Sequence, residues 1–406
     1  MTPRKTDIHF PIYLDNHAST RVDPRVVQAM LPFFTEQYGN ASSSDHRFGW
    51  YAKEAVDMAR RRIAKTIHAE PNEIIFTSGA TESNNLALKG IAETYRDKGN
   101  HLVTCATEHS SVLDVCRSLE LSGFRVTVVP VDWAGRIEMD AFEAALTRDT
   151  ILVSVMAANN EIGTCAPIEA LGRMCRSRQI LFHTDAAQAF GKIQLNVRTQ
   201  CIDVMSLSAH KIYGPKGIGA LFLRRSNGGV RLMPQVDGGG HEWGLRAGSL
   251  NVPGIVGFGE AAHLAESVYD AERKHLAMLR DKLEQGITES RDVIVNGDTE
   301  NRLPNNSSLT FFGITAKELM SEVREIAIST GSACTSEDIE REEYSHVLKA
   351  IGLDSEQAKS TVRFGVGRFT TENEIDYTVA RITAYLRQHR AAAALATVKN
   401  YSTRDR

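Results

Sequence analysis

The stretch Ile180-Leu-Phe-His-Thr-Asp-Ala-Ala-Gln188 joins a short apolar run to a polar turn. The same order recurs between residues 70 and 225, where an apolar, β-rich run is followed by a polar or glycine-containing turn and then by a helical stretch. Such alternation is typical of an α/β domain with a mostly parallel sheet. The runs are Glu73–Thr77, His101–Cys105, Phe124–Val129, Ile151–Val155, Ile180–His183 and Val204–Leu207.

Polar clusters directly follow five of these runs. In an open α/β sheet, ligands bind at the carboxyl ends of the strands. Five polar clusters at five strand ends therefore predict one composite pocket, which is more specific than any single cluster. The clusters read SGATESNN (78–85), ATEHSS (106–111), AANNEIG (157–163), TDAAQ (184–188) and SAHK (208–211).

Composition places the chain among ordinary globular proteins. Its 406 residues are 42% hydrophobic and 24% charged, a length that suggests two or three domains. The net charge of -3 gives no sign of attraction to nucleic acid or to a membrane surface. No apolar run approaches the roughly 18 residues of a transmembrane helix, and the N-terminus lacks the apolar core of a signal peptide. We therefore expect a cytoplasmic protein.

Helical periodicity separates the large α/β region from the C-terminal part of the chain. We predict a large domain at residues 21–260 and a smaller α+β domain at 261–390. Residues 1–20 are predicted to form an arm that joins the small domain, and residues 391–406 a tail. A long helical segment between residues 254 and 290 is expected to link the two domains, because apolar residues recur in it at spacings of three and four. These residues are Leu276, Leu279, Leu283 and Ile287.

One of the six cysteines differs from the rest. No two cysteines form a C-x-x-C pair, which argues against a zinc site, and without a secretion signal we expect no disulfide framework. Cys334 lies in the stretch STGSACTS (329–336), which has the composition of a loop and is followed by acidic residues. Small neighbours leave a thiol accessible, as a nucleophile or a redox thiol requires. Packing in a reducing environment is the simpler interpretation for Cys105, Cys116, Cys165, Cys175 and Cys201.

A lysine at a strand end suggests covalent chemistry. Lys211 lies in SLSAHKIYGPKG (206–217), flanked by small residues and a histidine. A lysine in such a pocket can form a Schiff base with the aldehyde cofactor pyridoxal phosphate. That cofactor also needs a phosphate cradle at a helix start, a carboxylate for its pyridine nitrogen, and a flat side chain to stack on its ring.

Each of these needs has a candidate in the polar clusters. Ala80 and Thr81 open a helix after a strand and would cradle the phosphate. Asp185 would pair with the pyridine nitrogen, and Gln188 would reach the ring hydroxyl. His109 is the candidate for ring stacking and proton transfer. Taken alone, the start of the helix at Ala80 and Thr81 and the carboxylate of Asp185 fit equally well as ordinary helix caps, and a lone histidine such as His109 is more often structural.

The segments in their fixed order resemble cysteine desulfurases of the IscS/NifS type, which are fold-type I pyridoxal-phosphate enzymes of the class V aminotransferase group. The resemblance runs from about Tyr13 to Ala380. The form of the cysteine segment is similar to that of the group with a longer cysteine loop. The segments are SGATESNN, TEHSS, NNEIGT, HTDAAQ, SLSAHKIYGPKGIGAL, RAGSLNVPGIVG and STGSACTS.

The resemblance implies roles for the cofactor-binding residues. Lys211 corresponds to the Schiff-base lysine, Asp185 and Gln188 to the partners of the pyridine nitrogen and ring oxygen, and His109 to the stacking histidine. Ser249 stands where the family usually has a threonine that reaches the partner subunit's phosphate, which implies a homodimer. The implied phosphate ligands are Thr81, Ser208 and His210.

The resemblance also implies the reaction. Asn160 and Arg363 would hold the carboxylate of L-cysteine, and Cys334 would attack its sulfur. The products would be L-alanine and a persulfide on Cys334, from which sulfur passes to an acceptor protein. Iron–sulfur cluster assembly, tRNA thiolation and DNA phosphorothioation all remain open as destinations. No direct nucleic-acid or membrane partner is implied.

Three features depart from the family pattern. His17, in YLDNHAST, replaces a small residue and is either part of the substrate mouth or a tolerated variant. Trp243 replaces a residue that is commonly arginine in the family, so the resemblance supports no inference about the rim of the site on the dimer side. The stretch after Cys334 is longer and more acidic than usual, and we predict that it alters the docking surface for the acceptor. Its acidic residues include Glu340, Glu342 and Glu343.

Two other interpretations of the sequence stay open. The first is a different pyridoxal-phosphate enzyme of the same fold, such as an aminotransferase or a selenocysteine lyase; a transaminase has no need of Cys334. The second is a non-catalytic scaffold or DNA-associated factor that keeps the fold. Against the scaffold stands the complete set of Lys211, Asp185, His109 and Cys334.

Overall fold

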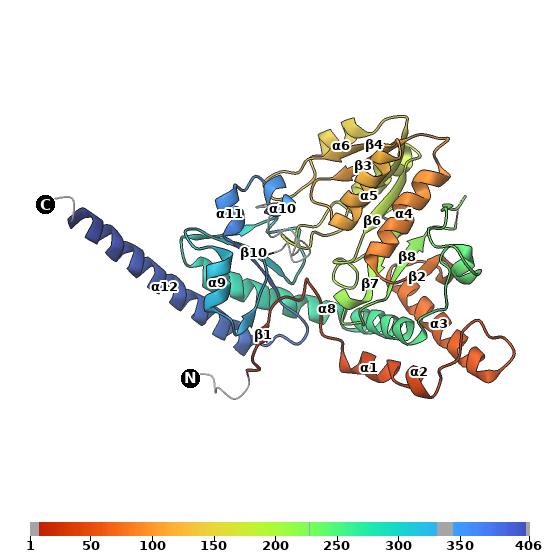
Figure 1. The fold of residues 1–406 in the computed structure, drawn as a ribbon, viewed down its shortest axis with the longest axis horizontal. Helices are drawn as coiled ribbons and strands as arrows, with labels where there is room; N and C mark the ends of the chain where they lie inside the picture. Colours follow the sequence, from red (N-terminus) through yellow and green to blue (C-terminus); the bar gives the residue numbers. More distant parts are fainter. Residues whose placement is uncertain (1–7, 227, 331–343, 403–406) are drawn as a thin grey trace.

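The computed structural model describes residues 8–226, 228–330 and 344–402. Its larger body is a seven-stranded sheet with helices on both faces (Figure 1), in the order β2-β8-β7-β6-β5-β3-β4. All pairs from β7 to β4 are parallel, and β8 is antiparallel to both of its neighbours. The predicted α/β class with a mainly parallel sheet is confirmed. The strands are β2 (Ile74–Thr77), β3 (His101–Cys105), β4 (Arg125–Val129), β5 (Thr150–Ser154), β6 (Leu181–Asp185), β7 (Val204–Ser208) and β8 (Gly219–Leu223).

Helices cover both faces of this sheet because its central strands are apolar on both sides. On one face, α4 and α5 pack in a cluster that includes Leu88 and Val112. On the other face, α3 and α7 pack in a cluster that includes Ile63 and Leu171. The helices of this body are α1 (Pro24–Met30), α2 (Pro32–Thr35), α3 (Arg47–Thr66), α4 (Ala80–Thr94), α5 (Ser110–Leu121), α6 (Met139–Ala145) and α7 (Ile168–Ser177), with short η2 (Pro71–Glu73), η3 (Ala209–Lys211) and η4 (His241–Gly244).

Helix α8 (Val252–Thr288) runs from the larger body into a smaller one (Figure 1). There its four periodic apolar residues are buried in a separate core cluster, together with residues of a three-stranded antiparallel sheet. The domain boundaries at residues 20, 260 and 390 stay predictions. The elements of the smaller body are β9 (Val293–Asn296), β10 (Asn306–Phe311), β11 (Ile326–Ala327), β12 (Thr361–Gly365), α9 (Ala316–Glu322), α10 (His346–Ala350), α11 (Ser355–Lys359) and α12 (Glu372–Ser402).

The N-terminal segment lies with the smaller body. Strand β1 (Ile12–Tyr13) pairs in parallel with β11, and Asp15 forms a bridge to Gly365 at the end of β12. Residues 14–20 then continue towards the larger sheet, where the Thr20 amide donates to the carbonyl of His210 at 3.0 Å. The segment therefore contacts both bodies. Among the residues that the structure describes, no helix is long and apolar enough to cross a membrane.

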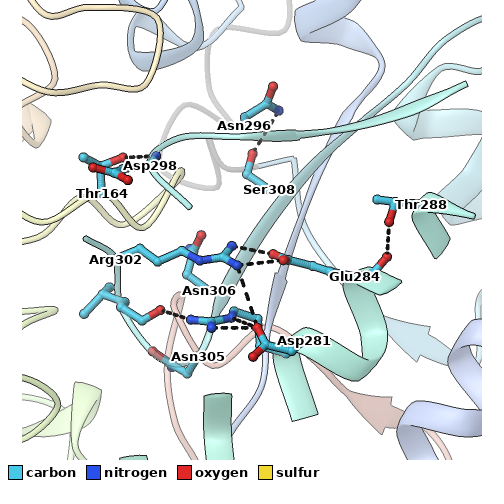
Figure 2. A network of polar contacts seen from close by, with 12 residues as sticks. Thr164, Asp281, Glu284, Thr288, Asn296, Asp298, Arg302, Asn305, Asn306 and Ser308 are labelled. Atoms are coloured by element: carbon cyan, nitrogen blue, oxygen red, sulfur yellow. Dashed lines mark hydrogen bonds and ion pairs between the residues drawn. The ribbon is translucent and has the colours of Figure 1, made fainter. Parts of the chain in front are cut away.

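A polar network fixes the segment that leads into β10 (Figure 2). Arg302 donates to both oxygens of Glu284 on α8, at 2.7 and 2.8 Å, and the two side chains are 9% and 10% exposed. Nearby, the amide of Asp298 donates to Thr164 Oγ1 at 3.0 Å. The network therefore ties residues 298–302 to α8 and to a loop of the larger body, just before Asn305.

Removing one member of the buried Arg302–Glu284 pair should be costly. We expect Arg302→Met to lower the free energy of unfolding by about 3–5 kcal/mol, because Glu284 is left as a buried charge. Urea unfolding measures this loss. The exposed pair Arg125–Asp149, at 2.9 Å with side chains 55% and 62% exposed, provides the control. Arg125→Met should cost less than about 1 kcal/mol, and equal losses at the two sites would contradict the prediction.

Candidate active site

A cavity of about 570 Å³ lies at the carboxyl ends of the parallel strands. Its walls come from the segments after β2, β3, β5, β6 and β7, which are the five polar clusters of the sequence, and from His17, Ala18 and Arg363. The structure thus brings together ten of the predicted site residues. They are Ala80, Thr81, His109, Asn160, Asp185, Gln188, Ser208, His210, Lys211 and Arg363.

Two predicted site residues are not among those that the structure places at this cavity. Ser249 is exposed after η4 and is absent from the cavity wall. Cys334 lies outside the described residues, as do Glu340, Glu342 and Glu343. Trp243 is described, and its ring contacts two guanidinium groups, those of Arg60 and Arg225.

One end of the cavity suits an anion. The first-turn amides of α4, at Ala80 and Thr81, have no partner within the helix, as at any helix start. His210 faces the same space, and its pKa is lowered to about 4 by burial and by the neighbouring cations Lys211, Lys216 and Lys192. These cations favour a negatively charged ligand at this position.

Asp185 ends β6 with its carboxylate held from two sides. Oδ2 accepts from Asn84 Nδ2 at 2.7 Å, and Oδ1 accepts from the amide of Ala187 at 2.9 Å. Asn84 also donates to Ser111 Oγ at 2.8 Å, so it joins α4, α5 and β6. In the sequence, Asn84 is only one member of a polar cluster and has no predicted role. The available signal for a role at the site was its position one helical turn after the start of α4, which places it near the same end of the helix.

His109 caps α5 and lines the cavity. The amide of Ser111 donates to Nδ1 at 3.1 Å, so this nitrogen carries no proton in the neutral ring. The ring proton therefore lies on Nε2. This geometry defines one tautomer of the histidine that is predicted to stack and to transfer protons.

Two buried acids beside these residues have no predicted role in the sequence. Burial raises the pKa of Glu108 well above its usual value, and Asp185 raises it further. Burial also raises the pKa of Glu161, whose Oε2 accepts from Ser345 Oγ at 2.5 Å. His346 Nε2 lies 2.8 Å from the main-chain oxygen of Glu108 and donates to it. Ser345 and His346, which follow the stretch that contains Cys334, are thus hydrogen-bonded to the turns that carry His109 and Asn160.

Arg363, on β12, brings the smaller body to the cavity. Its NH1 donates to the main-chain oxygen of Asn160 at 3.0 Å, and its NH2 donates to Asp15 Oδ1 at 2.9 Å. Its Nε is buried with no partner among the described residues. The predicted substrate pair, Asn160 and Arg363, is therefore in direct contact, and three of the five guanidinium N–H groups are not used by these two hydrogen bonds.

Lys211 projects towards the wall formed by the N-terminal segment. Its Nζ donates to the main-chain oxygens of His17 and Ala18, at 2.5 and 2.9 Å. The amine is therefore at the cavity and not in bulk solvent. Asp185 and His109 line the same cavity.

This fold and this site are those of a class V aminotransferase. Residues 12–378 match the family described as "Aminotransferase class-V", and the chain belongs to that family. It is 50% identical over 386 residues to a cysteine desulfurase IscS of Anaeromyxobacter dehalogenans (strain 2CP-C), covering 95% of each chain. This relative and the family match confirm the prediction of a cysteine desulfurase of the IscS/NifS type.

Solved structures agree with this assignment. A NifS-like protein superposes with a TM-score of 0.85 at 37% identity, over 92% of this chain and 99% of that one. A structure described as SspA in complex with cysteine superposes with a TM-score of 0.78 at 37% identity, over 89% of this chain and all 100% of that one. The chain therefore shares its fold with these proteins over nearly its whole length.

The cysteines predict a simple labelling pattern. Burial raises the pKa of Cys105 to about 11 and those of Cys116, Cys165 and Cys175 to about 12, so these thiols stay protonated at pH 8. Iodoacetamide at pH 8 should leave these four unmodified in the folded protein and label Cys334, as read by peptide mass spectrometry. Labelling of all six after denaturation is the control, and rapid labelling of Cys105, Cys116, Cys165 and Cys175 without denaturant would contradict the prediction.

Proposed function

We propose that Lys211, Asp185, His109, Arg363 and Cys334 act together in a pyridoxal-phosphate-dependent conversion of L-cysteine to L-alanine, with the sulfur left as a persulfide on Cys334. The observation that carries the proposal is that the first four of these residues line one cavity. The relatives named as cysteine desulfurases and the similar structure with cysteine bound support cysteine as the substrate.

The residues at the cavity fit the cofactor. The amides of Ala80 and Thr81, with Ser208 and His210, would hold its phosphate; Asp185 would hold its pyridine nitrogen, and Gln188 would meet its ring oxygen. Bound there through Lys211, pyridoxal phosphate supplies an electron sink that weakens bonds at the substrate carbon atoms next to the amine. The low pKa of His210 supports the fit, because three lysines around it leave positive charge that a phosphate would balance.

The substrate is oriented by its carboxylate. Arg363 lines the cavity and is held by Asn160 and Asp15, each through one N–H of a terminal guanidinium nitrogen. A carboxylate in the cavity that accepts from a remaining N–H of these terminal nitrogens would receive a charge-assisted hydrogen bond. Such binding would place the α-carbon of cysteine beside Lys211. Once the amine of the substrate has replaced the Lys211 amine on the cofactor, the freed amine would take the proton from that carbon.

The transfer of sulfur needs the thiol of Cys334 at the cavity. Ser329 exchanges main-chain hydrogen bonds with Arg363, at 3.3 and 2.7 Å. Cys334 follows five residues later, so the chain can carry it at most about 17 Å from this point, which is enough to reach the cavity. The thiolate attacks the substrate sulfur: an S–S bond forms, the Cβ–S bond breaks, and its electron pair remains on the carbon skeleton. His109 Nε2 is the proposed atom for holding and delivering protons during these steps.

An apolar surface near the N-terminus supports the proposed homodimer. Seven large apolar or aromatic side chains between residues 27 and 51 are 40–65% exposed. The ring centroids of Tyr38 and Phe48 lie 5.2 Å apart. Exposed groupings of this kind mark interaction sites. They are Val27, Leu31, Phe34, Tyr38, Phe48, Trp50 and Tyr51. Ser249 is exposed as well and would reach the partner subunit's phosphate. We also propose that the persulfide passes to an acceptor protein.

The role of Cys334 is tested by replacing it. We expect Cys334→Ala to abolish sulfide release from cysteine in the presence of a reductant, while the absorbance band of the lysine-bound cofactor stays. Lys211→Ala should lose the band itself, because the covalent link is gone. Cys201→Ala serves as the control and should keep both properties. Unchanged sulfide production by Cys334→Ala would sink the proposal.

The dimer is tested at the same apolar surface. Phe34→Glu combined with Trp50→Glu should shift the protein to monomers in analytical ultracentrifugation, because two charges cannot be buried unpaired. The control is the replacement of Leu121, an exposed residue on α5 outside that segment, by Glu. A doubly substituted protein that sediments like the wild type would show that the dimer, if formed, uses another surface.

A further inference from the structure

His17 departs from the family pattern and has no role in the mechanism above, yet it is buried at the wall of the cavity. It is 1% exposed, and room for its ring exists because residue 365 is glycine. A Cβ on Gly365 would come within 2.8 Å of His17 Cδ2. The imidazole is therefore fitted into the junction between the N-terminal segment and β12.

The main-chain carbonyl of His17 accepts hydrogen bonds from two side chains of the site. Lys211 Nζ donates to it at 2.5 Å, and Gln188 Nε2 donates to it at 3.0 Å. The amine that is proposed to bond the cofactor and the amide that is proposed to meet the ring oxygen are thus held on one oxygen atom. A displacement of residue 17 moves both.

The imidazole of His17 contacts the same amide from its other side. Gln188 Oε1 accepts from Lys192 Nζ at 3.1 Å, so the amide orientation is fixed and Oε1 also faces His17 Nδ1 at 3.1 Å. On the other side of the ring, Nε2 lies 3.2 Å from the main-chain oxygen of Asn305. Both ring nitrogens therefore face acceptors, and a neutral imidazole has only one N–H to offer them.

The charges near His17 determine whether its ring carries one proton or two. Burial lowers the pKa of His17 well below its usual value, and the cations Lys192 and Arg363 lower it further, whereas hydrogen bonds to the acceptors Gln188 Oε1 and the Asn305 main-chain oxygen raise it. Burial likewise lowers the pKa of Lys192 to about 7; Lys211 and Arg363 act in the same direction, and Glu272 opposes them. A positive charge on either His17 or Lys192 disfavours a positive charge on the other. Both side chains face the same atom, Gln188 Oε1.

We propose that His17 and Lys192 are positioning residues that act through Gln188 Oε1 and hold Gln188 and Lys211 in their working orientation. This inference rests on the proposed function, because it assigns those two residues to the cofactor. It makes the identity of residue 17 a determinant of how Lys211 is presented, and not a tolerated variant.

The test uses the holoenzyme and follows the pH dependence of the absorbance band of the lysine-bound cofactor. We expect Lys192→Met to raise the midpoint of this titration by at least about 0.5 pH unit, because a cation beside Lys211 is removed. His17→Ala should lower the midpoint by a similar amount. Water that enters the polar space left by the ring solvates Lys192 and favours its charged form. His17→Asn keeps a side-chain donor for Gln188 Oε1 and should recover at least half of the shift.

Steady-state kinetics add a second readout. His17→Ala and Lys192→Met should each lower kcat about tenfold and change KM for cysteine by less than about twofold. The double variant should lose clearly less than the product of the two effects, because both residues act on one oxygen atom. The matched control is His101→Ala, which removes a buried histidine bonded to Thr150 and Thr127 at the opposite end of β3.

The control separates positioning from general destabilisation. His101→Ala should lower the thermal unfolding midpoint and leave the spectral midpoint in place. Spectral midpoints of His17→Ala and Lys192→Met that coincide with the wild type, or losses of kcat that simply multiply, would overturn the inference. A wild-type protein without the absorbance band would instead contradict the proposed function.

Discussion

The cavity depends on positive charge, part of which is kept out of water. Lys211, the exposed Lys216 and the buried Arg363 line it, and the buried Lys192 donates to Gln188 in its wall. Burial lowers the pKa of Lys192 to about 7 and that of His210 to about 4. Between about pH 6.5 and 4, an unfolded chain binds a proton at His210 that the folded chain does not bind, so the free energy of unfolding falls as the pH drops through this range. An anion in the cavity favours the charged forms of these groups and offsets the cost. Charge therefore links the stability of the fold to the proposed phosphate and carboxylate ligands.

The sheet explains why the groups meet at one place. Asp185 ends β6 and Ser208 ends β7, and these strands are adjacent and parallel. The chain returns at once through β8, so Lys211 lies on a short connection between two hydrogen-bonded strands. Gly217 ends this connection with a φ of +76°, a conformation that residues with a Cβ rarely adopt. The lysine is thereby held on the rigid edge of the sheet.

Sequence patterns predicted the parts of the site that depend on local order. The polar clusters follow strands, and the carboxyl ends of parallel strands share an edge, so Asp185, His109 and Lys211 could be placed together without coordinates. Strand β8 was not predicted, because GALFL follows a glycine-rich turn and continues the sheet antiparallel to its neighbours. The role of Asn84 was missed because its partner Asp185 lies 101 residues away. Neither composition nor spacing reports a contact of that kind.

The contribution of the smaller body was the hardest to predict. Arg363 could be assigned only through the family resemblance, and the contacts of His17 span 171 residues to Gln188 and 288 to Asn305. Asn305 follows the segment held by the Arg302–Glu284 pair, so the network in Figure 2 supports the oxygen that faces His17 Nε2. Arg363 is likewise fixed on both sides, by Asn160 of the larger body and Asp15 of the N-terminal segment. Arg363, which is proposed to bind the substrate, and the residues proposed to bind the cofactor thus come from separate bodies, and the N-terminal segment contacts both. A change at residue 17 therefore acts on the chemistry of Lys211 and on the junction of the two bodies through the same few atoms.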